Sequence, residues 1–253
     1  MSQEFKAILF DLSGVLYEGE SAIQGAAATI RAARDRNLIL RFVTNTATKP
    51  AGVIIADLAA MQIQIQPDEL YTAPKAAIEY VKQRGLRPFC LVHESIKKDF
   101  SDLPQQDPNC VILGDARDDL NYQSLNRAFG LCQSGAELIG IGMNKYFKDE
   151  SGLKLDAGPF IKALEWAADC EATIMGKPSG EFYQQVVRST GARAAECLMI
   201  GDDVSADVQG AMDAGLQGCL VKTGKYQPSD LKLLPAGARL LDSVSSLLQA
   251  LPQ

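Results

Sequence analysis

The stretch KAILFDLSGVLY, from Lys6 to Tyr17, decides the fold of this chain. It begins with a short, unbroken apolar run, AILF, which is typical of a parallel strand buried on both faces. The run ends at Asp11, so a carboxylate stands at the carboxyl end of a core strand, the edge where open α/β sheets bind ligands. Gly14 then lets the chain turn sharply. Asp11 is a candidate nucleophile, metal ligand or both, although a strand that simply ends in a polar turn has the same pattern.

Length and composition favour a globular intracellular protein. The 253 residues, 47% of them hydrophobic, are enough for one large α/β domain or two smaller ones. The net charge of −6 argues against a nucleic-acid partner, but a bound divalent cation can still attract a phosphorylated ligand. The six cysteines form no CxxC pair and are expected to be reduced. Because no signal-like segment or membrane-length apolar run is present, we expect a cytoplasmic protein without a membrane partner.

A single histidine, His93, excludes several kinds of site. A centre with several histidine ligands is impossible, and a Ser-His-Asp triad would have to use this one residue. His93 follows a strand-like run, so we expect it to have a structural or surface role.

Alternating strands and helices predict a parallel α/β sheet. A helix over Ile23–Arg36 and a strand over Leu38–Val43 follow the first strand, and the second strand ends in Thr44-Asn45-Thr46. This βαβ unit delivers polar residues from both strands to one edge of the sheet. The pattern returns late in the chain, where a strand over Cys197–Ile200 is closed by Gly201-Asp202-Asp203.

The middle of the chain predicts a separate α/β domain over residues 74–173, inserted between core segments 1–73 and 174–253. Its expected helices are Lys75–Arg84, Ser95–Phe100, Tyr122–Cys132 and Gly158–Ala168, and its expected strands are Phe89–Val92, Cys110–Leu113 and Leu138–Ile141. Trp166, in the last of these helices, is expected to pack against its neighbours. A C-terminal helix near Ser243–Leu251 is expected to pack on the core sheet.

Four polar elements stand at strand ends or in loops of this frame: Asp11 with Ser13, Thr44 with Asn45, Lys177 in a Gly-Lys-Pro turn, and Asp202 with Asp203 and Asp207. Each is a weak signal alone, but together they predict a phosphate and Mg2+ site. Asp11 can attack phosphorus while its other oxygen binds Mg2+, and Asp202 offers a second hard oxygen. Thr44 and Asn45 can hold phosphoryl oxygens, and Lys177 adds a positive charge.

The motifs DxSGxL, VTN, GKP and GDDxxxD, in this order, resemble those of the haloacid dehalogenase-like hydrolases, a superfamily of aspartate-nucleophile phosphatases. The likeness extends over nearly the whole chain, through FDLSGVLY, RFVTNTATK, SGLKLDAGPFIKALEWA, GKPSGEFY, MIGDDVSADVQGAMDAG and VKTGKYQPSD. It implies a Rossmann-like three-layer α/β/α core with a parallel sheet and an inserted α/β cap of the C2 type (class IIA). It also implies a Mg2+ cofactor, a small phosphorylated substrate and a homodimer formed through the cap.

The same resemblance implies roles for individual residues. Asp11 and Lys177 would be catalytic, and the substrate would be bound by Asp11, Leu12, Ser13, Thr44, Asn45 and Lys177. The metal would be held by the Asp11 and Asp202 carboxylates and the Ser13 backbone carbonyl. Asp207 would orient Lys177 or a metal-bound water, while Asp203 would either ligate through water or support the site from outside the ligand set.

Ser13 departs from the family pattern, because most phosphatases of this superfamily have a second aspartate there that protonates the leaving oxygen. Serine is a poor general acid, and losing such help costs about 10²–10⁴ in rate when the leaving group needs a proton. We therefore hypothesise that preferred substrates have P–O–P bonds, P–N bonds or activated esters such as aryl phosphates.

Two rival classes of protein share part of this pattern. A phosphoryl-acceptor receiver domain also places acidic residues, a threonine and a lysine at strand ends, but it is much shorter and has no inserted domain. A phospho-ligand-binding protein without turnover would also fit the loss of the acid at Ser13. A P-loop protein is disfavoured, because the chain has no GxxxxGK[ST] motif.

Overall fold

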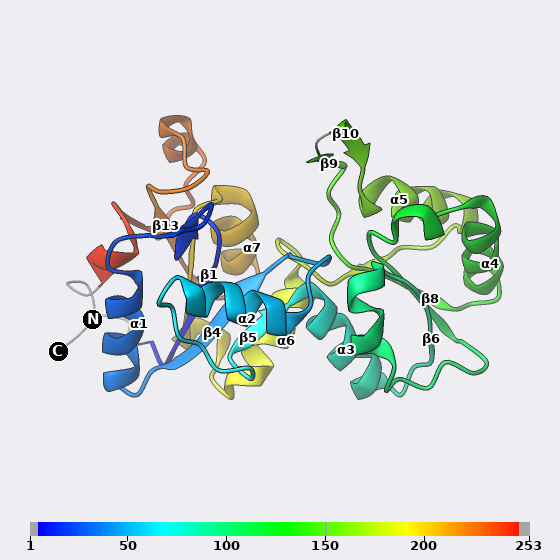
Figure 1. Ribbon diagram of the computed structural model, residues 1–253, viewed down its shortest axis with the longest axis horizontal. Coiled ribbons are helices and arrows are strands. Elements are labelled where there is room, and N and C mark those ends of the chain that lie inside the picture. Colours follow the sequence, from blue (N-terminus) through cyan, green and yellow to red (C-terminus); the bar gives the residue numbers. More distant parts are fainter. Residues whose placement is uncertain (1–4, 150, 248–253) are drawn as a thin grey trace. The chain divides into compact units, whose positions relative to one another are not determined.

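A computed structural model describes residues 5–149 and 151–247 of the chain. It divides into two compact units (Figure 1). The first unit consists of the described parts of Met1–Thr44, Ala51–Tyr71 and Lys177–Gln253. The second consists of Asn45–Pro50 and the described part of Thr72–Gly176. The short segment after the second strand is therefore grouped with the inserted part of the chain.

The first unit is built on a six-stranded sheet in the order β14-β13-β12-β1-β4-β5. Its strands are β1 (Ala7–Asp11), β4 (Ile39–Thr44), β5 (Leu70–Thr72), β12 (Cys197–Gly201), β13 (Gln217–Val221) and β14 (Arg239–Leu241). β1 is central and pairs in parallel with both β4 and β12, and every residue of β1 is buried. The continuous apolar run therefore marks the middle of a parallel sheet, as predicted.

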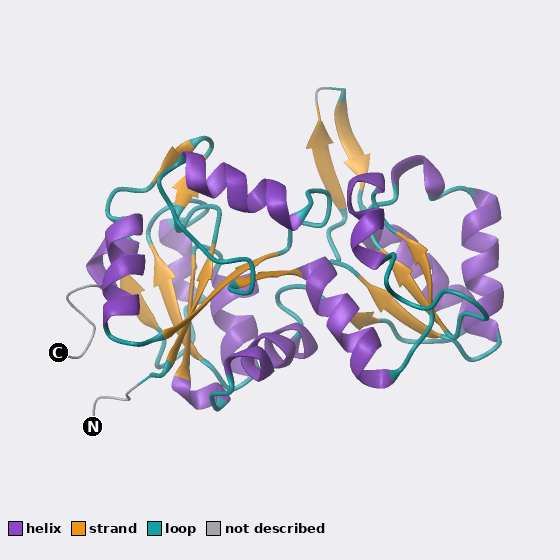
Figure 2. Cartoon of the chain, turned by 60° about the horizontal axis from the view of Figure 1, so that its bottom comes forward, coloured by secondary structure: helices purple, strands orange, loops and turns teal. Residues whose placement is uncertain are grey.

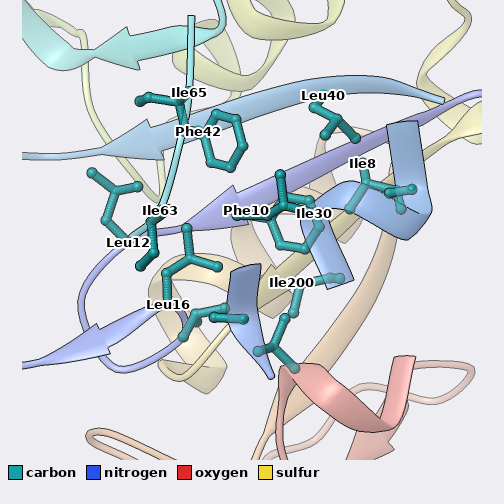
Figure 3. Packing of buried hydrophobic residues seen from close by; sticks show 14 of the residues in the cluster. Ile8, Phe10, Leu12, Leu16, Ile30, Leu40, Phe42, Ile63, Ile65 and Ile200 are labelled. Carbon is teal, nitrogen blue, oxygen red and sulfur yellow. The ribbon is translucent and has the colours of Figure 1, made fainter. Parts of the chain in front are cut away.

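One face of this sheet is covered by α1 (Ala26–Asp35) and α2 (Ala51–Ala60). The side chains of Phe10 and Phe42, from the neighbouring strands β1 and β4, stack there with ring centroids 5.7 Å apart. Figure 3 shows them packed with residues of the same cluster, including Ile8, Ile30 and Ile200. This apolar layer forms the main core of the first unit.

The opposite face of the sheet carries α6 (Gly180–Thr190), a π-helical turn η4 (Val204–Gln209) and α7 (Gly210–Asp213). Because side chains alternate along a strand, Arg41 of β4 points away from the first face, and it donates hydrogen bonds to Ser189 on α6. Leu220 of β13 likewise packs on Val208 of η4. The first unit is thus the predicted three-layer α/β/α core.

The second unit has its own parallel sheet, in the order β11-β8-β7-β6 (Figure 2). Its strands are β6 (Pro88–Leu91), β7 (Cys110–Leu113), β8 (Glu137–Gly140) and β11 (Thr173–Ile174). Its helices are α3 (Ala73–Arg84), α4 (Tyr122–Gln133) and α5 (Ala157–Ala168), with a 3-10 helix over Glu94–Phe100. The α3, α4 and α5 helices begin at side-chain caps of the residue types that helix N-termini favour, namely Thr72, Asn121 and Asp156.

Three features of the fold differ from the sequence-based expectations. Trp166 is 85% exposed rather than packed, because α5 buries the side of the helix that carries Ala157, Ile161 and Leu164. An antiparallel hairpin, β9 (Tyr146–Asp149) with β10 (Gly152–Leu155), was not expected. The short antiparallel pair of β2 (Tyr17–Glu18) with β3 (Ser21–Ala22) was also not expected. The predicted C-terminal helix begins as a short 3-10 turn over Val244–Ser246, and its part beyond residue 247 lies outside the described residues.

Candidate active site

Three strand tips of the first unit deliver polar side chains to one edge of its sheet. Asp11 is level with Val43 of β4, so Thr44 lies one residue beyond it on the neighbouring strand. On the other side of β1, strand β12 ends at Gly201, immediately before Asp202. Because all three strands are parallel, Asp11, Thr44 and Asp202 stand at the carboxyl edge, where such sheets bind ligands.

The turn after β1 is shaped by close contact with Asp202. Gly14 has a φ of +84°, which L-residues with a side chain rarely adopt, and a Cβ there would lie 2.0 Å from Asp202 Oδ2. Glycine is therefore required for the chain to turn over this carboxylate. The Leu12 amide donates a hydrogen bond to Asp11, and Ser13 is exposed on the turn.

Lys177 joins two of the predicted acidic residues. Its Nζ donates to Asp11 Oδ1 and to Asp207 Oδ1, the second at 2.6 Å, and all three side chains are buried. The two carboxylates raise the pKa of Lys177 against the opposing effect of burial, so this lysine keeps its charge. A positive charge is therefore held beside Asp11, where it could bind a phosphate group.

Asp207 is oriented by its own surroundings. Its second oxygen accepts the Asp203 amide at 3.2 Å, while Asp203 Oδ1 accepts the amides of Ser205 and Ala206 and so caps the η4 turn. Burial, with the Asp11 charge adding to it, raises the pKa of Asp207 to about 6. Both Asp207 oxygens thus accept hydrogen bonds, one of them from Lys177, and Asp203 caps the η4 turn beside it.

Tyr183 is a further support that the sequence did not indicate. Its hydroxyl donates to the backbone carbonyls of Ala206 and Asp207, at 2.8 and 3.1 Å, and burial raises its pKa well above the ordinary value. The hydroxyl thus stays protonated and serves as a buried donor. Nothing in the sequence around Tyr183 distinguishes a tyrosine that packs in a core from one that supports a site.

Asp202 has the features of a metal ligand. Its Oδ2 accepts the Lys225 amide at 2.7 Å, but its Oδ1 is buried and has no hydrogen-bond partner among the described residues. Burial raises the pKa of both Asp202 and Asp11. One carboxylate oxygen from each of Asp11, Asp202 and Asp207 lies within 4.8 Å of the others. Hard oxygen donors this close together, one of them unpaired, fit a small divalent cation.

The first unit thus brings Asp11, Lys177, Asp202 and Asp207 together. Thr44 is buried at the end of β4, and Asn45 begins the second unit, so the joint role of these two residues in holding phosphate stays a prediction. No helix in the described parts of the chain, 5–149 and 151–247, is long and apolar enough to cross a bilayer.

The sequence matches two models of related families. The model described as "Haloacid dehalogenase-like hydrolase" matches residues 8–104, and a second, HAD-hydrolase-like model matches residues 174–247. Haloacid dehalogenase-like hydrolase domain-containing protein 2 of Homo sapiens is 42% identical over 225 residues, which cover 89% of this chain and 87% of that protein. The chain belongs to the haloacid dehalogenase-like hydrolases.

This haloacid dehalogenase-like hydrolase has other relatives whose names state a substrate. The phospholysine phosphohistidine inorganic pyrophosphate phosphatase of Xenopus laevis is 41% identical over 234 residues, covering 90% of this chain and 87% of that protein. Among solved structures, the 4-nitrophenylphosphatase of Thermotoga maritima has a TM-score of 0.84 at 23% identity and covers 99% of this chain and 98% of its own. The last comparison concerns the fold alone, and it confirms the predicted core with an inserted α/β unit.

Proposed function

We propose that this hydrolase is a Mg2+-dependent phosphatase that acts through an aspartyl-phosphate on Asp11. The observation that carries the proposal is the buried group in which Lys177 links Asp11 to Asp207 beside an unpaired oxygen of Asp202. A lysine and a set of carboxylates at the carboxyl edge of a parallel sheet match the needs of a phosphoryl group with a divalent cation. The names of the relatives, which include a phosphatase of pyrophosphate and of phosphorylated lysine and histidine, support the same class of reaction.

In the first step, a carboxylate oxygen of Asp11 forms a bond to phosphorus while the bond from phosphorus to the leaving group breaks. Lys177, held in place by Asp207, offsets negative charge on the phosphoryl oxygens. Thr44 and Asn45 bind the remaining phosphoryl oxygens. Asp11, Asp202 and the Ser13 carbonyl would hold Mg2+, which would supply charge neutralisation. Water then attacks the aspartyl-phosphate, which releases phosphate and restores Asp11.

The leaving group decides which substrates this site can use. Ser13 is exposed on the turn after β1, and serine is a poor general acid near neutral pH. Without a proton donor, the leaving groups of three kinds of substrate depart more readily than those of simple alkyl phosphates. These substrates are pyrophosphate, phosphoramidates such as phospholysine or phosphohistidine, and aryl phosphates. We propose these three groups as the substrate class, with residues 74–173 forming an inserted cap and residues 1–73 and 174–253 forming the catalytic core. A homodimer formed through that cap and a cytoplasmic location belong to the same proposal.

A substrate panel with purified protein and Mg2+ tests this proposal. We expect turnover of pyrophosphate, a phosphoramidate and 4-nitrophenyl phosphate, and much slower turnover of a sugar phosphate. Asp11→Asn keeps the shape of the side chain but removes the nucleophile, so it should abolish turnover and the hydroxylamine-sensitive phosphate on the protein. A strong preference for the sugar phosphate contradicts the leaving-group argument, and full activity of Asp11→Asn contradicts the nucleophile.

The exposed serine at position 13 favours one other function, a phospho-ligand-binding protein that does not turn its ligand over. Such a protein would bind phosphate or pyrophosphate with Mg2+ but release no product from any member of the panel. Calorimetric binding of pyrophosphate, measured beside the turnover assay, separates the two functions.

A further inference from the structure

The loop after β13 contains three consecutive residues, Thr223, Gly224 and Lys225, called here the TGK segment, that bond to the turn after β1, to β2 and to Asp202. The Thr223 hydroxyl donates to the Gly14 carbonyl at 2.5 Å, and the Gly224 amide donates to the Glu18 carboxylate at 2.7 Å. The Lys225 amide donates to Asp202 Oδ2 at 2.7 Å. This loop, far from Asp11 in the sequence, thus binds both the turn after β1 and one predicted metal ligand.

Gly224 is packed where no other residue fits. Its φ is +63°, and a Cβ there would lie 2.1 Å from Asp202 Oδ2 and 2.5 Å from the Cα of Gly14. Both neighbours are held, the first by the Lys225 amide and the second as backbone, so neither can move away at low cost. The two glycines, in the turn after β1 and the loop after β13, therefore lie close to Asp202 Oδ2, and the TGK segment can approach the carboxylate only as bare backbone.

The consequence lies in the two oxygens of Asp202. Oδ2 is occupied by the Lys225 amide and enclosed by the glycines, whereas Oδ1 is buried without a hydrogen-bond partner among the described residues. A carboxylate held in this way can present one oxygen to an ion but cannot bind it through both. Mg2+ takes six ligands at short distances and is commonly bound by single carboxylate oxygens, whereas Ca2+ takes six to eight and often uses both.

We propose that the TGK segment is a positioning element that fixes Asp202 as a one-oxygen ligand and thereby favours Mg2+ over Ca2+. This inference rests on the proposed function, because it needs Asp202 to bind the metal. The Lys225 side chain is not part of it: it is largely exposed, and its Nζ lies 3.8 Å from Asp203. The acting groups are the Thr223 hydroxyl, the Gly224 backbone and the Lys225 amide.

Metal binding without substrate is the first test, measured by titration calorimetry with Mg2+ and, separately, Ca2+. Gly224→Ala should weaken Mg2+ binding about tenfold or more, the effect expected when a group that orients a metal ligand is displaced. It should weaken Ca2+ binding less, so the Mg2+/Ca2+ preference falls. Gly85→Ala is the matched control: Gly85 has the same φ of +63° but no atom within 4 Å of a new Cβ, and it lies outside the first unit.

A milder pair of variants guards against a folding defect. Thr223→Val removes the hydroxyl that donates to Gly14 at nearly constant volume, and Thr223→Ser keeps a hydroxyl. Thr223→Val should lower Mg2+ affinity several-fold, and Thr223→Ser should restore most of it. Thermal unfolding without metal, run on every variant, shows whether the loss of affinity exceeds the loss of stability.

The outcomes separate this inference from the function on which it rests. If the unmodified protein binds Mg2+ and Asp202→Asn does not, the site stands, and equal Mg2+ binding by Gly224→Ala and Gly85→Ala overturns the role of the TGK segment. An unchanged Mg2+/Ca2+ preference in Gly224→Ala overturns the selectivity argument. If the unmodified protein binds no divalent cation, the proposed function itself fails.

Discussion

Replacing Lys177 with methionine tests the electrostatics of the site directly. The lysine lies between two buried carboxylates, and its Nζ is 2.6 Å from Asp207 Oδ1. At an effective dielectric constant of about 20, two unit charges at that separation attract by about 6 kcal/mol, and the cost of desolvation offsets part of this. Removing one partner of a buried ion pair typically costs about 3–5 kcal/mol, so Lys177→Met should lose that much of its free energy of unfolding near pH 7. For a chain of this size the loss corresponds to a melting temperature lower by about 6–20 °C.

The pH dependence of this loss identifies its cause. In the folded protein the pKa of Asp207 is raised to about 6, so folding favours the protonated carboxyl. The resulting contribution to stability is present below the pKa of the unfolded chain and is lost as the pH rises through 6. Without the lysine, Asp11 and Asp207 should titrate at still higher pH, so the difference between Lys177→Met and the unmodified protein should narrow as the pH falls from about 7 to about 5.

Unfolding is followed by far-ultraviolet circular dichroism with a chelator present, so that no metal substitutes for the lysine. Lys222→Met is the control, because Lys222 forms a 2.8 Å ion pair with Asp242 but is exposed, and such pairs contribute about 0–1 kcal/mol. Equal stability of the Lys177→Met and Lys222→Met variants refutes the reasoning. A deficit that is the same at both pH values shows that lost packing, not uncompensated charge, is responsible.

Three further predictions follow from single residues. Ser13→Asp should raise the turnover of a simple alkyl phosphate by about 10²-fold, the low end of the effect of a general acid, with little change for 4-nitrophenyl phosphate. Steady-state kinetics on both esters tests this, and an equal rise in the two rates contradicts the leaving-group argument. Tyr183→Phe removes the donor to the Ala206 and Asp207 carbonyls and should lower the free energy of unfolding by about 1–3 kcal/mol. An unchanged midpoint of urea unfolding would show that the hydroxyl does not stabilise the site. Glu196→Gln should be less stable than the unmodified protein at neutral pH, because the hydrogen bond from Arg193 lowers the pKa of Glu196 from 4.5 to about 2. The difference in melting temperature between the two proteins should shrink as the pH falls from 4.5 towards 2. A difference that stays constant over this range contradicts the prediction.

The sequence predicted those parts of the fold that depend on local pattern. A continuous apolar run between polar turns gave the strand over Cys110–Leu113 to the residue, and the apolar run ending at Asp11 gave the central strand of the first unit. The hairpin of β9 and β10 was not visible, because Tyr146, Leu153 and Leu155 are exposed and their strands do not alternate clearly between apolar and polar residues. Trp166 was misplaced for a related reason: a large aromatic in a helix is usually buried, but the side of the helix it occupies is set by its neighbours.

In the candidate site, too, some residues could be predicted from local sequence pattern and others could not. Residues directly after strands, such as Asp11 and Asp202, could be placed from the sequence, because parallel strands end at a common edge. Supporting contacts could not be placed, because they join segments far apart in the chain. The TGK segment lies more than two hundred residues from the turn it bonds, and nothing local in Thr-Gly-Lys distinguishes it from an ordinary turn.

The single positive charge of Lys177 cannot neutralise the three carboxylates of the site. Asp11, Asp202 and Asp207 together carry three negative charges when ionised, and Lys177 supplies one positive charge. Two negative charges would remain in a buried group. Burial, with a neighbouring carboxylate adding to it, raises the pKa of each carboxyl. A divalent cation would cancel the remaining charge, and the oxygen of Asp202 that has no hydrogen-bond partner among the described residues could bind it. In the proposed function, the burial that makes these carboxyls hard to ionise without metal would favour a bound divalent cation, and that cation would help to keep Asp11 ionised.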